Sequence, residues 1–212
     1  MAAVEREYAA LAPRSSASWP DPHEGGSPSQ DEYSRVTEPA RYRIVGARAD
    51  AWARALVSLE LATEERTDAP AGWRGPVGAT ASRLVPHAAG ALPLIVVRGE
   101  FENTPDTVVV LHADAAEPLY LGIEPDCGCD ARDRGSEDLL EAIDDLYIDV
   151  IAGDFVHVSG PGWTARAGRN RWETSGDVPD DMEKVFADAT AGRPTPFSVV
   201  TGAAWWCGSP AE

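Results

Sequence analysis

The chain has few cysteines, almost no lysine and no long hydrophobic run. Its 212 residues include three cysteines, too few for a disulfide framework, so they favour a reducing compartment. No stretch approaches the ~18 apolar residues that a membrane span needs. No charged start followed by an apolar run marks a secretory signal. We therefore expect a cytoplasmic protein that does not enter a membrane.

Positive charge is also scarce. Acidic residues number 35 against 18 basic ones, which gives a net charge of −17. Lys184 is the only lysine, and together with abundant alanine this indicates the coding bias of a GC-rich genome. A net charge of this size repels phosphate, so binding to nucleic acid or to an anionic membrane is disfavoured.

Length and composition favour one folded domain behind a tail. Apolar residues make up 43% of the chain, enough to bury a core. Residues 1–32 combine Pro, Gly, Ser and acids, and we expect them to form a disordered tail or linker. Within it, Val4–Leu11 is compatible with one short helix, and residues 13–32 form the flexible linker. Residues 33–210 then form the folded domain.

Apolar residues recur at helical and strand spacing in this domain. Over Thr37–Ala62 and Glu137–Ala152 they return every three or four residues, which predicts two helices with one buried face each. Short Val- and Ile-rich runs predict strands joined by connections too short for parallel crossovers. The predicted strands are Leu94–Phe101, Thr107–His112, Leu119–Glu124, Phe155–Ser159, Trp163–Ala167, Arg171–Thr174 and Phe197–Val200, and a third helix is predicted at Asp180–Ala191. We expect a single α+β domain with an antiparallel sheet and about three packed helices.

Charge is unevenly distributed along the chain. Tyr33–Ala55 contains five arginines against two acids, a net of +3, whereas Glu124–Asp154 contains eleven acids against two arginines, a net of −9. Such asymmetry can mark an interaction surface. The alternative is that the two segments face each other within the fold.

The most unusual segment is C-G-C at Cys127, Gly128 and Cys129, among acids. Two neighbouring thiols can hold Zn²⁺, with Cys207 and an Asp or His as further ligands, although zinc sites usually place two to four residues between paired cysteines. Redox pairs usually place two residues between them. A metal site, a redox pair and a tight turn without chemistry all stay open.

This segment also carries a resemblance. Pro125–Asp133, read P-D-C-G-C-D-x-x-D and followed by an acidic helix, and Tyr33–Tyr42 resemble an actinobacterial family of uncharacterised small acidic proteins. The resemblance covers roughly residues 33–205. It implies a shared fold and a bacterial cytoplasmic setting, and it brings no activity.

An acidic row lies on the second predicted helix. Glu137, Glu141, Asp145 and Asp149 stand at successive i, i+4 positions, where like charges destabilise a helix by a few tenths of a kcal/mol. A basic partner would neutralise this row, so these four residues are candidates for partner binding. A solvated helix face is the alternative.

The chain also contains seven tryptophans. Trp205 and Trp206, close to the C-terminus, are further candidates for anchoring a partner. Packing of the same side chains into the core is the alternative.

Catalytic motifs are missing from the sequence. It contains no G-x-S-x-G, Walker loop or H-E-x-x-H. We therefore predict a non-enzymatic binding or regulatory module for a basic protein partner, without a cofactor. The main alternative is a metal-dependent enzyme or metal-stabilised module, with zinc held by Cys127, Cys129 and nearby acids. A third possibility is a small-molecule binder with a tryptophan-lined pocket.

Overall fold

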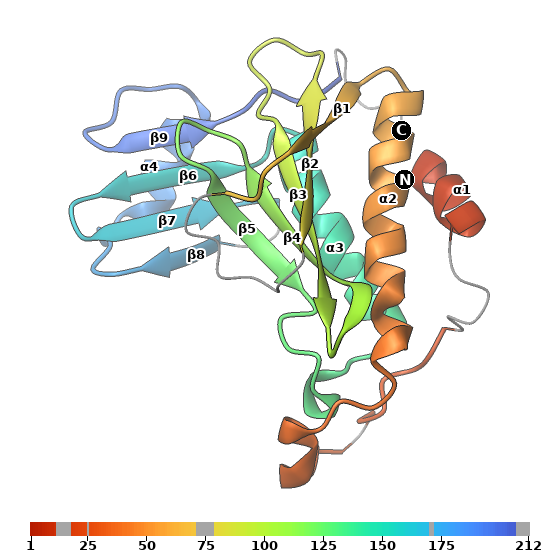
Figure 1. Ribbon diagram of the computed structural model, residues 1–212. Helices are drawn as coiled ribbons and strands as arrows, with labels where there is room; N and C mark the ends of the chain where they lie inside the picture. Colours follow the sequence, from red (N-terminus) through yellow and green to blue (C-terminus); the bar gives the residue numbers. More distant parts are fainter. Residues whose placement is uncertain (12–17, 25, 71–78, 170–171, 207–212) are drawn as a thin grey trace. The chain divides into compact units, whose positions relative to one another are not determined.

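The computed structural model describes residues 1–11, 18–24, 26–70, 79–169 and 172–206 (Figure 1). The helices are α1 (Ala2–Leu11), α2 (Arg43–Ser58), α3 (Ser136–Ile151) and α4 (Met182–Thr190), with short 3₁₀ helices at Gln30–Ser34, Pro39–Tyr42 and Asp130–Arg132. The strands are β1 (Ala62–Thr67), β2 (Thr80–Pro86), β3 (Leu94–Phe101), β4 (Thr104–Ala113), β5 (Leu119–Glu124), β6 (Val156–Gly160), β7 (Trp163–Ala167), β8 (Trp172–Ser175) and β9 (Ser198–Thr201).

These strands form two sheets, ordered β1-β2-β3-β4-β5 and β8-β7-β6-β9, with antiparallel pairing. The predicted α+β class is confirmed, with the strands divided between two sheets. The chain contains two compact units. The first unit is Met1–Val85 with Pro93–Tyr147, and the second is Pro86–Leu92 with Ile148–Glu212.

In the first unit, α2 and α3 pack beside each other on one face of the five-stranded sheet. Leu111 in β4 lies opposite Gly122 in β5, so both belong to this face. A Cβ atom on Gly122 would come within 2.7 Å of Leu146 in α3, so glycine allows the helix to approach the strand. The rings of Trp52 in α2 and Tyr147 in α3 stack with centroids 5.1 Å apart.

The other face of this sheet is apolar as well. Ile95 and Val97 in β3 and Val108 and Val110 in β4 form a buried cluster there. Because both faces of these two strands are covered, their sequences are continuous apolar runs without alternation. This explains why β3 and β4 are recognisable from the sequence.

Arg48 in α2 is a buried charge that connects three helices. Its side chain lies between Asp144 of α3 and Glu5 of α1, and the residue is 3% exposed. Arg48 donates to both oxygens of Asp144, at 2.8 and 2.5 Å, and to Glu5 at 2.7 Å. Trp52 adds a hydrogen bond to Asp144 at 2.7 Å, and the Tyr8 ring lies 5.1 Å from the guanidinium. The network therefore satisfies a charge that has little access to water.

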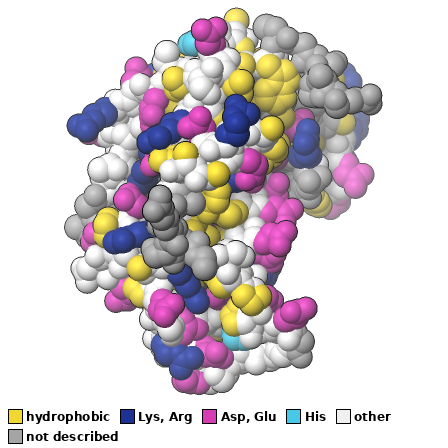
Figure 2. All heavy atoms as spheres, turned by 90° about the vertical axis from the view of Figure 1, so that its right-hand side faces the viewer, with side chains coloured by type: hydrophobic (Ala, Val, Ile, Leu, Met, Phe, Trp, Pro, Cys, Tyr) yellow, Lys and Arg dark blue, Asp and Glu magenta, His cyan; other side chains and the backbone are white. Residues whose placement is uncertain are grey.

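The basic and acidic segments of the sequence face each other in the first unit. Three arginines of Tyr33–Ala55 form ion pairs with three acids of Glu124–Asp154: Arg35 with Asp130, Arg41 with Asp133, and Arg48 with Asp144. The structure confirms this alternative for these three pairs. On the face seen in Figure 2, acidic and basic side chains are interspersed and do not form separate fields.

Where the structure describes residues 1–32, predicted as a tail, they form the helix α1 and contact the rest of the first unit. Val4 in α1 is 2% exposed. The Trp19 indole donates to Asp133 at 2.9 Å, and its backbone amide donates to Ser136 at 3.1 Å. The composition of the segment does not show that it is ordered, because the hydrogen-bond partners of Trp19 lie 114 and 117 residues away in the sequence.

The structure also shortens one predicted helix and adds two strands. The helix predicted at Thr37–Ala62 begins as α2 at Arg43, after a 3₁₀ turn, and ends at Ser58. β1 and β2 were not predicted. β1 is an edge strand with four exposed residues in its centre, and charged edge strands lack the apolar alternation that marks a strand.

In the second unit, α4 packs on the four-stranded sheet. The core includes Val158, Trp163 and Val185, and the rings of Trp163 and Phe197 meet edge to face with centroids 4.9 Å apart. None of the helices in the described ranges has the length and hydrophobicity needed to cross a membrane.

Loss of the Asp144 carboxylate should strongly destabilise the protein. In Asp144→Ala, Arg48 stays buried and keeps Glu5 as its remaining carboxylate in this network, and breaking such a pair costs about 3–5 kcal/mol. Urea unfolding measures this loss. Asp145→Ala, one residue further along α3, is the control and should change stability by less than about 0.5 kcal/mol.

The double variant Arg48→Met, Asp144→Leu separates charge from packing. Because it removes both charges together, it should recover most of the stability lost in Asp144→Ala. If Asp144→Ala unfolds at the wild-type urea concentration, the pair does not hold the helices together.

Candidate functional site

An acidic pocket of about 780 Å³ lies in the first unit, beside α3 and the segment that follows β5. Seven carboxylates, two arginines and one histidine contribute to its lining: Asp21, Glu124, Asp126, Asp133, Asp138, Glu141 and Asp145, with Arg132, Arg134 and His23. With the histidine neutral, the lining carries a net charge of −5. We call this feature the acidic pocket.

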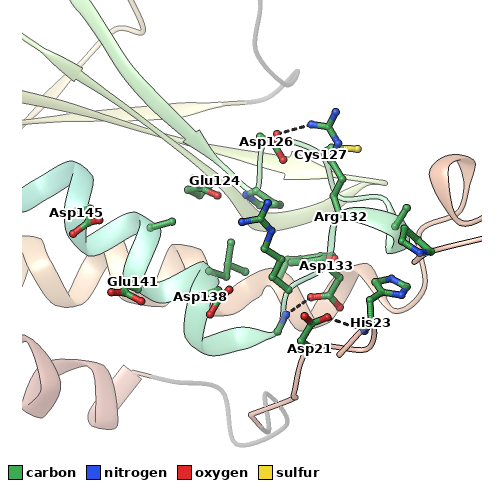
Figure 3. A pocket seen from close by; sticks show the side chains of 18 of the residues that line it. Asp21, His23, Glu124, Asp126, Cys127, Arg132, Asp133, Asp138, Glu141 and Asp145 are labelled. Atoms are coloured by element: carbon green, nitrogen blue, oxygen red, sulfur yellow. Dashed lines mark hydrogen bonds and ion pairs between the residues drawn. The ribbon is translucent and has the colours of Figure 1, made fainter. Parts of the chain in front are cut away.

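One wall of the acidic pocket is a face of α3. Asp138, Glu141 and Asp145 are three and four residues apart, the spacing that places side chains on one side of a helix, and Figure 3 shows them along it. Within the described part of the chain, none of these three carboxylates has a hydrogen-bond or ion-pair partner. Asp138 and Glu141 are exposed and Asp145 is half-buried.

The other four carboxylates of the lining are engaged within the chain. Asp126 pairs with Arg132 at 2.7 Å, and Asp133 pairs with Arg41 at 2.8 Å. Asp21 accepts a backbone hydrogen bond, and Glu124 also has an interaction within the protein. The negative charge available to a ligand is therefore concentrated on α3.

The predicted acidic row does not form one surface. Glu141 and Asp145 line the acidic pocket, whereas Glu137 is exposed outside its lining. Asp149 is 7% exposed and accepts the backbone N–H of Arg169 at 2.9 Å. A step of four residues advances about 40° around a helix, so a row of such steps turns away from its first face. Asp149 is therefore buried away from the other three acids of the row, and a role for it in partner binding stays a prediction.

The two tryptophans near the C-terminus also differ in their surroundings. Trp205 is 2% exposed, and its backbone and indole N–H groups donate to the carbonyls of Ile151 at 2.9 Å and Leu92 at 3.1 Å. The structure thus places Trp205 in the interior of the second unit, which matches the alternative of core packing, and its role as a partner anchor stays a prediction. Trp206 is half-buried, and its role stays a prediction.

The two thiols of the C-G-C segment lie next to each other. Their Sγ atoms are 2.8 Å apart, and both cysteines are free. Cys127 is half-buried and contributes to the lining of the acidic pocket, whereas Cys129 is 6% exposed. Burial, together with the neighbouring Cys127 sulfur, raises the pKa of the Cys129 thiol.

Gly128 allows this turn to lie against an aromatic ring. A Cβ atom at this position would come within 2.5 Å of the Phe101 ring, closer than any real contact of that kind. A larger residue between the two cysteines would therefore require the Phe101 ring to move.

The acids near the thiols already have partners. Asp126 pairs with Arg132, and Asp130 binds the backbone and side chain of Thr37. Among the described residues, no group of three or more His, Cys, Asp or Glu side chains is placed to hold a metal ion. Cys207, the third predicted zinc ligand, lies outside the described residues, so zinc binding by the three cysteines stays a prediction.

Asp130 anchors the segment that carries the thiols. Its carboxylate accepts hydrogen bonds from the Thr37 amide and hydroxyl, both at 2.7 Å, and from Arg35 at 2.8 Å. Burial by itself raises the pKa of Asp130, but the hydrogen bonds from Arg35 and Thr37 outweigh it and lower the pKa to about 2. Asp130 is therefore ionised, and its role is to hold the segment that carries the thiols in place.

Residues 4–207 match a family of unknown function, DUF6226. The chain belongs to this family. Comparison with curated proteins finds no match, and neither does comparison with solved structures. The family match confirms that the resemblance is to a family of unknown function, while the actinobacterial origin stays a prediction.

The DUF6226 match begins at residue 4, so it includes the segment predicted as a tail. That segment supplies Asp21 and His23 to the acidic pocket, and a ring nitrogen of His23 lies 3.1 Å from the backbone oxygen of Asp130. Sequence reasoning missed both residues because their neighbours are about a hundred positions away. Asp138 could have been identified as a site residue from the sequence, because its spacing from Glu141 places both side chains on one face of the helix.

The Asp130 anchor should make stability dependent on pH in the acidic range. Because folding lowers the pKa of Asp130 from 3.8 to about 2, its contribution is complete above pH 3.8 and disappears as the pH falls towards 2. Asp130→Asn should cost about 1–2 kcal/mol at neutral pH, once solvent screening is allowed for. Urea unfolding at several pH values measures the difference between variant and wild type.

This difference should shrink as the pH falls from 4 to 2. Glu117→Gln, at an exposed position of the same unit, is the control and should show no such change. A difference that stays constant with pH would mean that the ionised carboxylate is not what anchors the segment.

Proposed function

We propose that this protein is a non-enzymatic binding module whose acidic pocket receives the cationic side chains of a basic protein partner. The observation that carries the proposal is the α3 wall, with carboxylates of Asp138, Glu141 and Asp145 that are unpaired among the described residues. Each can accept charge-assisted hydrogen bonds from an arginine or lysine side chain.

The shape of the site supports a cationic ligand. A cleft lined by one sign of charge focuses the electrostatic field and raises the local concentration of the oppositely charged ligand. Arg132 is already paired with Asp126, so Arg134 is the remaining arginine of the lining against the three unpaired carboxylates of α3 among the described residues. The net charge of −17 would also accelerate encounter with a basic protein.

The length of the α3 wall supports a polypeptide ligand. Asp138 and Asp145 are seven residues apart, about 10 Å along the helix axis. One guanidinium or ammonium group cannot contact both ends of such a wall. A chain with several basic side chains can, and a planar guanidinium matches a carboxylate especially well.

The α3 carboxylates should be necessary for binding a basic peptide. The variant Asp138→Asn, Glu141→Gln, Asp145→Asn should bind a fluorescent oligo-arginine peptide about tenfold more weakly, because each exposed charge pair contributes about 0.5 kcal/mol. Fluorescence anisotropy measures the affinity. Binding should also weaken as salt is raised, because these charges are screened.

A charge-matched control distinguishes the pocket from bulk charge. Glu102→Gln, Glu117→Gln, Asp177→Asn removes the same number of charges at exposed positions outside the pocket lining, and it should change the affinity less than twofold. Equal losses in both triple variants would refute the pocket as the binding site. Circular dichroism confirms that both variants are folded.

A further inference from the structure

We propose that Cys127 and Cys129 form a redox-active dithiol that exchanges with low-molecular-weight disulfides, preferentially those that carry positive charge. This proposal depends on the thiol geometry and on the lining of the acidic pocket. It does not depend on the protein having a basic partner.

The two sulfurs are placed for bond formation. Their Sγ atoms are 2.8 Å apart, and the Cys129 amide donates a hydrogen bond to the Cys127 sulfur at 3.4 Å. Because Cys127 and Cys129 are two residues apart, their Cα atoms lie within about 7 Å of each other in any backbone conformation. This limit overlaps the range of Cα–Cα distances that disulfides bridge. Oxidation therefore needs little movement of the turn.

The two thiols differ in how accessible they are to an external disulfide, and this difference assigns a separate role to each. Cys127 is half-buried and contributes to the pocket lining, so an external disulfide reaches it first. Figure 3 shows it beside Asp126 on the turn after β5. Cys129 is 6% exposed, so it is shielded from a bulky reagent but remains within reach of Cys127.

The reaction proceeds in two balanced steps. The Cys127 thiolate attacks one sulfur of R–S–S–R, forming the Cys127–S–S–R mixed disulfide and releasing R–S⁻. The Cys129 thiolate then attacks the Cys127 sulfur, which forms the intrachain disulfide and releases the second R–S⁻. The two protons of the cysteine thiols pass through solvent to the released thiolates, and the two electrons of the oxidation leave with them.

The charge of the pocket gives this exchange a preference. Because the lining carries seven carboxylates against two arginines, an anionic disulfide is repelled and a cationic one is attracted. Cystamine, which bears two ammonium groups, should therefore react faster than oxidised glutathione, which is anionic. The part of this preference that comes from charge should weaken as salt is raised, because exposed charges are screened.

Peptide mapping of the oxidised wild-type chain tests the proposal without a substitution. After treatment with cystamine and trypsin, residues 99–132 form one peptide that contains both Cys127 and Cys129, separate from Cys207. We expect this peptide to be lighter by two hydrogens and to regain them after reduction. Two cystamine adducts on it, or a Cys127 adduct that persists, would overturn the proposal.

Single variants then test the order of the steps. Cys129→Ser should stop at a mixed disulfide on Cys127, and Cys127→Ser should react at least tenfold more slowly at Cys129. Equal reaction rates in the two variants would overturn the assigned roles. In Asp138→Asn, Glu141→Gln, Asp145→Asn the advantage of cystamine over oxidised glutathione should fall, whereas the intrachain disulfide should still form.

Loss of peptide binding and loss of disulfide formation are independent results. A protein that forms the intrachain disulfide but ignores oligo-arginine retains the redox site and loses the proposed function. The reverse result retains the binding function and removes the redox site.

Discussion

The buried ion pair between Arg48 and Asp144 is the interaction on which the helical layer of the first unit depends. A guanidinium with almost no exposure must find its hydrogen-bond acceptors within the protein, since the alternative is an uncompensated charge away from water. Asp144 provides them from α3, and Glu5 provides another from α1. The N-terminal helix is therefore part of the fold, although its composition alone does not indicate this.

The same pairing of charges explains how the acidic pocket arises. Arginines between residues 33 and 55 neutralise the acids that point into the fold, including Asp130 and Asp133. The acids on the pocket side of α3 receive no such partner among the described residues. The acids of α3 that point into the fold therefore contribute to stability, whereas those that line the acidic pocket remain available to a ligand.

The thiol pair depends on these contacts too. Asp130 follows Cys129 directly and is held by Thr37 and Arg35, while Gly128 allows the turn to lie on the Phe101 ring. The position of the two sulfurs is therefore set by tertiary contacts on both sides of the turn. Anchors of this kind keep a short segment in one conformation, as a reactive pair requires.

Local sequence patterns determined the elements that carry their own periodicity. The apolar stripe of α3 and the runs of β3 and β4 are visible without a structure, because burial selects side chains at the helical or strand repeat. Only the tertiary structure decided the packing of α1 and of the segment around Trp19, the edge strand β1, and which acids of α3 have no partner among the described residues. Each of these depends on partners distant in the sequence. The opposite net charges of Tyr33–Ala55 and Glu124–Asp154 indicate that the two segments face each other, but they do not show which arginine pairs with which acid.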